Sequence, residues 1–91
     1  MYRVSDTVRI THNQDGAIVL DVRQGQMFNL NFVGSRILQH LKTGYTESGI
    51  VDEISREFNV SRNLAEIDVR EFLQNLKNCH LVDEQESGVA A

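Results

Sequence analysis

Proline is absent from this chain, and cysteine occurs once, at Cys79. A single cysteine excludes an intrachain disulfide and the cysteine-rich zinc signatures. No apolar run approaches the ~18 residues of a membrane-spanning helix, and the segment Met1 to Asp6 lacks the apolar core of a signal peptide. Without proline, a common linker signal is missing. We therefore expect a cytoplasmic protein with no membrane partner, and the length of 91 residues favours one domain.

Basic residues are also scarce. Nine Lys and Arg stand against thirteen Asp and Glu, which gives a formal net charge of -4. Surfaces that bind nucleic acid are basic, because they must neutralise phosphates. The charge balance therefore argues against a nucleic-acid partner, and it suits either solubility or a partner that carries basic patches.

A catalytic constellation is missing as well. Cys79 and His80 are adjacent near the expected end of a helix, and neighbouring side chains on a helix do not face each other. We interpret Cys79 as a small buried apolar residue and His80 as a helix C-terminal residue. Single glycines form neither a P-loop nor a dinucleotide fingerprint. Metal-ligand spacing is also lacking among the three histidines, which are His12, His40 and His80. We predict no enzyme, no catalytic or metal-binding residues and no cofactor.

Three extended segments separated by turn signals occupy the N-terminal third. Asp15-Gly16 is a strong turn signal after the first segment, and Arg23-Gln24-Gly25 forms a second tight connection. Apolar, β-branched and alternating residues define the segments themselves, at residues 7–10, 17–22 and 26–30. This pattern predicts a small three-stranded antiparallel meander.

Three segments with helical periodicity follow. Asn31, Thr46 and Ser61 are suitable N-caps, and Gly44 stands where a helix C-terminus needs a left-handed residue. The predicted helices are residues 32–42, a segment after Thr46 that ends near 58, and a segment after Ser61 that ends near 78. Leu81-Val82 can add a short final strand. We expect an α+β fold with a single domain over residues 1–82 and a flexible C-terminal tail over 83–91.

The last two helices flank a short break at Asn59-Val60 and form a candidate helix-turn-helix. A winged-helix DNA-binding transcription factor is therefore an alternative function of another class. In that case the third helix would enter the major groove, where acidic side chains oppose phosphate. This helix carries as many acids as bases, namely Glu66, Asp68 and Glu71 against Arg62, Arg70 and Lys77. The missing basic stripe argues against DNA.

Two other features suit a bound peptide. On the third helix, Leu64 and Ile67 lie outside the core stripe, beside Asp68 and Glu71; they are either ordinary exposed apolar residues or the rim of a peptide site. The strand at 26–30 is the last of the meander and has no proline or charge to protect its edge. It is either a short edge protected by its brevity or a site for strand addition.

The ordered series of residues resembles the PqqD-like family from about Val8 to Val82. The matching positions are 15–21, 25–31, Gly34, Ile37, Leu41, 44–46, Ile54, 58–60, Asp68, Val69, Phe72, Leu73, Leu76 and 81–82. Two positions depart from the family pattern: Leu38 stands where Trp is common, and His80 stands where Gly is common. These departures leave the subfamily open.

The resemblance implies a winged-helix-like domain that binds the leader segment of a ribosomally made precursor peptide. The leader would add as a strand to the third strand of the meander and dock against the third helix. Phe28 and Leu30 can instead belong to the core, with Met27 and Asn29 on the other face. The implied peptide-binding residues are Gln26, Met27, Phe28, Asn29, Leu30, Leu64, Ile67, Asp68 and Glu71.

Two kinds of partner enzyme follow from the resemblance. Stand-alone members serve lasso-peptide maturation, where they deliver the leader to a leader peptidase. Others serve pyrroloquinoline quinone biosynthesis, as peptide chaperones for a radical S-adenosylmethionine enzyme. The departures at Leu38 and His80 favour the lasso type.

Overall fold

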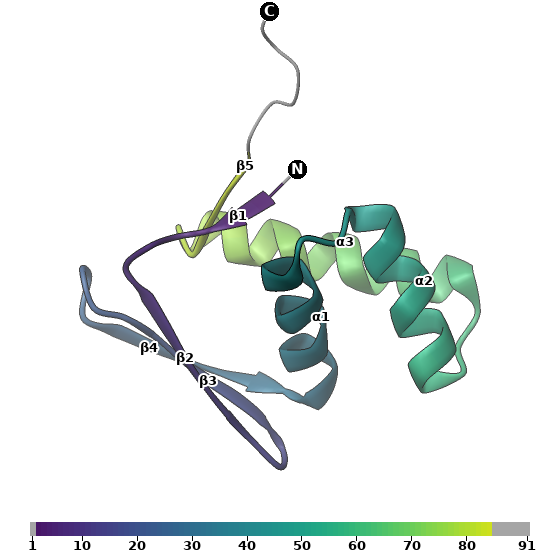
Figure 1. The fold of residues 1–91 in the computed structure, drawn as a ribbon, viewed down its shortest axis with the longest axis horizontal. Helices are drawn as coiled ribbons and strands as arrows, with labels where there is room; N and C mark the ends of the chain where they lie inside the picture. Colours follow the sequence, from purple (N-terminus) through teal and green to yellow (C-terminus); the bar gives the residue numbers. More distant parts are fainter. Residues whose placement is uncertain (1, 85–91) are drawn as a thin grey trace, which may run out of the picture.

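The computed structural model describes residues 2–84, and the chain order is strands, then helices, then a short strand (Figure 1). The elements are β1 (Tyr2–Val4), β2 (Val8–Asn13), β3 (Gly16–Asp21), β4 (Gln26–Asn31), α1 (Phe32–Thr43), α2 (Glu47–Phe58), α3 (Arg62–Asn78) and β5 (Val82–Glu84). The three-stranded sheet followed by three helices confirms the predicted α+β fold, and the winged-helix description is compatible with it.

The sheet has the order β2-β3-β4, and both neighbouring pairs are antiparallel. Val19 pairs with Ile10 on one side and with Phe28 on the other, so these side chains share the face that packs on the helices. Leu20 pairs with Met27 on the opposite face, where both are exposed. The alternation places one face of β4 against the core and the other toward solvent.

Helix α1 joins directly to β4 and packs on the sheet on one side and on α2 on the other (Figure 1). Asn31 caps its first turn by accepting a hydrogen bond from the Gly34 N–H at 2.8 Å, and Gly44 ends it in the left-handed conformation, with φ of 102°. Thr46 and Ser61 cap α2 and α3 in the same way. All three predicted N-caps are confirmed.

The core lies where the three helices meet β3 and the C-terminal strand. Buried apolar residues come from every one of these elements: Val19, Ile37, Leu38, Leu41, Ile50, Val51, Ile54, Ala65, Val69, Leu73, Leu76, Leu81 and Val82. No helix among residues 2–84 has the length and apolar character to cross a membrane.

Both ends of the chain depart from the expected elements. Strand β1 was not predicted, and it pairs antiparallel with β5, with Val4 opposite Val82. The final strand begins at Val82 and extends to Glu84, so the domain boundary expected at 82 falls inside a strand. The rest of the expected tail, residues 85–91, lies outside the described residues.

The segment after α3 corrects two smaller expectations. The helix ends at Asn78, and Cys79 is its C-cap; Cys79 is half-buried against the core rather than fully buried. His80 lies beyond the helix in the left-handed region, with φ of 61°, so it is not a helical residue. The left-handed conformation of His80 changes the direction of the chain, and the next residue, Leu81, is buried in the core.

Candidate functional site

Strand β4 is an edge of the three-stranded sheet, as the sequence predicted. Within residues 2–84 it pairs only with β3, so its other edge has backbone N–H and C=O groups without a strand partner. Phe28 and Leu30 are partly buried and pack against the core, whereas Met27 is 65% exposed. Of the two alternatives for this strand, the core role of Phe28 and Leu30 is therefore the one observed, with Met27 and Asn29 on the outer face.

A cavity of about 290 Å³ lies where β4 ends, between the first turns of α1 and the middle of α3. Val33, Ile37 and Phe72 line it with apolar side chains, and its polar groups come from the β4–α1 junction and from α3. The lining residues are Asn31, Val33, Gly34, Ile37, Asp68 and Phe72. The structure therefore brings Asp68 to the end of β4, as the predicted site requires.

Gly34 permits this close approach of α1 and α3. A Cβ atom at this position would lie 2.8 Å from Cε1 of Phe72 and 3.2 Å from Oδ1 of Asn31. Both distances are shorter than ordinary contacts, so a larger residue would push the Phe72 ring out of place. Gly34 thus determines the shape of the cavity, which sequence reasoning did not foresee.

The remaining predicted residues of α3, which are Leu64, Ile67 and Glu71, lie outside the lining of this cavity. At about 100° per residue, Leu64, Glu71 and Ile67 lie about 40°, 60° and 100° around the helix from Asp68, all on the side away from Phe72. Leu64 is 57% exposed and Ile67 is 54% exposed. Together with Asp68 and Glu71 they form one exposed side of α3, which we call the α3 rim. Phe72 is half-buried and lines the cavity.

We call the surface formed by the free edge of β4, the cavity and this rim of α3 the groove. Sequence reasoning missed its floor, which α1 supplies through Val33, Gly34 and Ile37. Their apolar spacing was visible in the sequence, but it indicates a helix face and not which face is open. Peptide binding by the groove residues stays a prediction.

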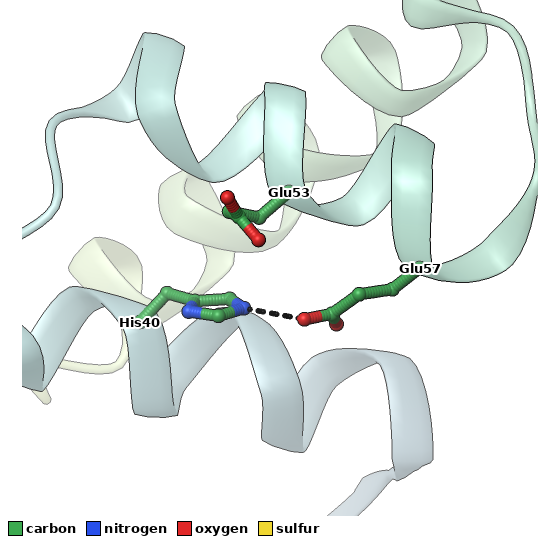
Figure 2. Close-up of side chains that lie close together, drawn as sticks. All are labelled: His40, Glu53 and Glu57. Atoms are coloured by element: carbon green, nitrogen blue, oxygen red, sulfur yellow. Dashed lines mark hydrogen bonds and ion pairs between the residues drawn. The ribbon is translucent and has the colours of Figure 1, made fainter.

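Titratable side chains also meet where α1 packs on α2. His40 of α1 lies close to Glu53 and Glu57 of α2, with ligand atoms within 4.8 Å of one another (Figure 2). His40 Nε2 is 3.1 Å from Glu57 Oε2. Sequence reasoning treated His40 as isolated, because the two glutamates come from a different helix.

Arginines already pair with both of these carboxylates. Arg36 donates to Glu57 through Nε at 3.2 Å and Nη2 at 2.8 Å, and Arg56 pairs with Glu53. The hydrogen bonds from Arg36 hold the pKa of Glu57 below its ordinary value, with a further contribution from His40. A divalent cation held by His40, Glu53 and Glu57 would have to displace two guanidinium groups. We therefore interpret the cluster as an ion-pair network that joins α1 to α2.

A larger cavity of about 450 Å³ lies at the other end of β4. Its lining is polar and consists of Ser5, Thr7, Asp21, Arg23, Gln24, His80 and Asp83. Buried Asp21 accepts hydrogen bonds on Oδ1 from the Thr7 hydroxyl at 3.2 Å and from the backbone N–H groups of Arg23 and Gln24 at 3.0 and 3.3 Å. Because Asp21 stabilises the β3–β4 turn, we assign this carboxylate a structural role.

The chain matches a protein-family model and is similar to solved structures. The family model for PqqD, described as coenzyme PQQ synthesis protein D, matches residues 16–82. A structure of TbiB1 in complex with the TbiA(beta) leader peptide is 36% identical, with a TM-score of 0.86 over 93% of this chain and 99% of that chain. None of the curated proteins matches.

Two more distant structures share the fold. One is lasso peptide synthetase B1 complexed with the leader peptide, at 24% identity and a TM-score of 0.83, covering 91% of this chain and 98% of that chain. The other is the solution structure of the PqqD truncation of Methylobacterium extorquens PqqCD, a stand-alone recognition element for ribosomally synthesised and modified peptides, at 16% identity and a TM-score of 0.75 over 91% and 88% of the two chains. The resemblance seen in the sequence is confirmed: the chain belongs to the PqqD family.

Proposed function

We propose that this protein binds the leader segment of a ribosomally made precursor peptide and does not itself catalyse a reaction. The observation that carries the proposal is the likeness to TbiB1, a structure solved with a leader peptide, at 36% identity over nearly the whole chain. The groove supports it physically, because it combines a free strand edge with a cavity that has both apolar and polar lining residues.

In the proposed complex the leader adds as an extended strand to the free edge of β4. Backbone hydrogen bonds provide affinity, and alternate side chains of the leader face opposite sides of the sheet. Those on the inner side meet the cavity and the α3 rim at Leu64, Ile67, Asp68 and Glu71. Those on the outer side pass Met27, which the register places on the solvent-facing side of β4.

We further propose that the bound leader is delivered to a maturation enzyme, a lasso leader peptidase. The support is that two of the similar structures are leader-peptide complexes and that one of them is a lasso peptide synthetase component. The alternative is a chaperone for a radical S-adenosylmethionine enzyme in pyrroloquinoline quinone biosynthesis, which the name of the family model favours. Pull-down of each class of enzyme by the protein with its peptide bound would separate the two.

Binding of duplex DNA fits the structure less well. The exposed rim of α3 carries Asp68 and Glu71, and Arg62 and Arg70 are engaged with acids of α2. The acidic side chains of this rim would repel phosphate. Steep loss of duplex binding with added salt would favour DNA, whereas binding by backbone hydrogen bonds and apolar contacts depends less on salt.

Selection from a displayed library of random peptides tests the proposal without knowledge of the natural leader. We expect enriched peptides to perturb the NMR amide signals of Gln26–Asn31 and of the exposed face of α3 when they are titrated. N-methylation at alternate backbone positions of such a peptide should abolish binding, since those N–H groups would bond to β4. Failure to enrich peptides, or binding that leaves β4 unperturbed, would contradict the proposal.

A mass measurement tests the absence of catalysis. The protein incubated alone with a selected peptide should leave the peptide mass unchanged. Cleavage or modification that persists after repurification would overturn this part of the proposal. In that event Cys79→Ala would test the thiol as nucleophile, because Cys79 is the chain's one cysteine.

A further inference from the structure

Two acidic side chains at the groove rim differ from the other acids of α2 and α3. Arginines lie within 4.0 Å of all the others, in the pairs Glu47–Arg70, Asp52–Arg62, Glu53–Arg56, Glu57–Arg36 and Glu66–Arg70. Asp68 and Glu71 form no ion pair within the described part of the chain. Both are exposed, one turn apart on the same side of α3.

The basic side chains of α3 cannot supply the missing partner. At about 100° per residue, the bases of this helix lie about 100° or more around the helix from both acids. Arg70 contacts Glu47 and Glu66, and Arg62 contacts Asp52. A cation that neutralises Asp68 and Glu71 must therefore come from another molecule.

The rest of the groove does not offset this negative charge. Strand β4 (Gln26–Asn31) has no charged residue. The first turn of α1 has no acid, so the positive end of its dipole faces the cavity, but this end amounts to roughly half a unit charge. Asn31 also accepts from the Gly34 N–H, which reduces that effect. Two full negative charges exceed it, and the groove is electronegative.

Building on the proposed function, we propose that the leader segment carries a lysine or arginine near the apolar side chain that enters the cavity. Asp68 and Glu71 bind this cation at the rim. The apolar floor and the charged rim then recognise neighbouring positions of one extended peptide, which fixes its register along β4. The pairing also explains why these two acids, unlike their neighbours on α2 and α3, have no internal arginine.

Because both acids are exposed, the pairing should act mainly on selectivity and on the association rate. Replacing the basic residue of a selected peptide by glutamine should weaken binding about threefold to tenfold at low salt. The same replacement should have little effect on binding to the Asp68→Asn, Glu71→Gln double variant. Charge reversal through Asp68→Arg should favour peptides with an acid at that position.

The test selects from one random peptide library with the parent protein, with the Asp68→Asn, Glu71→Gln variant and with Asp15→Asn. Asp15 is an exposed acid on the β2–β3 turn, so its substitution is a control for the loss of a surface carboxylate outside the groove. We expect Lys or Arg to be enriched at one position relative to the apolar anchor by the parent and by the control, and not by the double variant. Melting curves of all three proteins check that each is folded.

The outcomes separate this inference from the proposed function. Peptides that perturb β4 and α3 in NMR titrations but show no basic preference would overturn the inference and leave leader binding in place. A basic preference that persists in the double variant would also overturn it. If no selected peptide binds at β4, the proposed function and this inference both fail.

Discussion

The contact of α1 with α2 and its junction with β4 and α3 treat polar groups in opposite ways. Toward α2, Arg36 and His40 both contact Glu57, and Arg56 pairs with Glu53. Figure 2 shows the contact between His40 and Glu57. Toward β4 and α3, a strand edge, an apolar cavity and the carboxylates of Asp68 and Glu71 have no such partners in the described residues. Helix α1 thus takes part in two different regions. The closed side is its contact with α2, where charges are paired within the protein, and the open side is the groove, where they are not.

This difference indicates which surface of a small fold is suited to bind a ligand. Groups that are satisfied within the protein stabilise it, whereas an exposed set of unpaired groups of different kinds is suited to a ligand. Titratable residues alone would direct attention to His40, Glu53 and Glu57. The absence of internal partners at Asp68, at Glu71 and along the edge of β4 instead directs it to the groove.

The largest expected effect on peptide binding comes from substitutions of the exposed apolar residues of α3. Leu64→Asp or Ile67→Asp should weaken binding of a selected peptide by about thirtyfold, because truncating or charging an apolar anchor costs ~2 kcal/mol or more. Both side chains are more than half exposed, so the melting temperature should change little. Fluorescence titration and melting curves check this. Val22→Asp, in the turn at the far end of β4 from the cavity, is the matched control.

A somewhat smaller effect is expected at Met27, on the outer face of β4. Met27→Asp should weaken peptide binding about tenfold, which is ~1.4 kcal/mol, since alternate side chains of an added strand pass this position. Unfolding of the variant would show that Met27 packs in the core. Unchanged binding would place the peptide away from the β4 edge.

Substitutions in the contact between α1 and α2 should lower the stability of the fold without weakening peptide binding. Glu57→Gln should lower the free energy of unfolding by about 1 kcal/mol, because Arg36 and His40 lose their charged partner in a partly buried contact. For a domain of this size that corresponds to about 4–8 °C in melting temperature. Glu53→Gln, whose partner Arg56 is 73% exposed, should have a smaller effect. A peptide-binding defect in Glu57→Gln would contradict the separation of the two sides.

The difference in stability between the parent and Glu57→Gln should decrease as the pH falls. The pKa of Glu57 in the folded protein lies below its ordinary value of 4.5, chiefly through the hydrogen bonds from Arg36. The unfolded state therefore binds the proton more readily, and the stabilisation is present above about pH 4.5 and lost as the pH falls through the folded pKa. Melting curves of parent and Glu57→Gln should converge at acid pH. A gap that stays constant down to pH ~3 would contradict this assignment.

The smallest effect is expected on the solvent-exposed surface. Asp52→Asn removes the pair with Arg62, in which both side chains are more than half exposed. Solvent and salt screen such a pair, so neither the melting temperature nor peptide binding should change measurably. A clear loss of stability would show that the α2–α3 contact depends on this pair.

Local signals in the sequence account for much of this structure. Asn31, Thr46 and Ser61 cap the helices as predicted, because capping depends only on residues within one turn. Apolar periodicity identified most of the core, and the order of the strands made β4 an edge. The exposed positions of Leu64 and Ile67 also followed from helical spacing alone.

Contacts between distant segments were decided only by the tertiary structure. Strand β1 forms by pairing with β5, which lies at the other end of the described chain. The three residues of β1 are too few to predict a strand from the sequence. His40 meets Glu57, and Phe72 meets Gly34, because of the way whole helices pack. Charge and periodicity are properties of the chain and can be read along it. Which acid finds an arginine, and which helix face stays open, depends on distances that only the folded molecule sets.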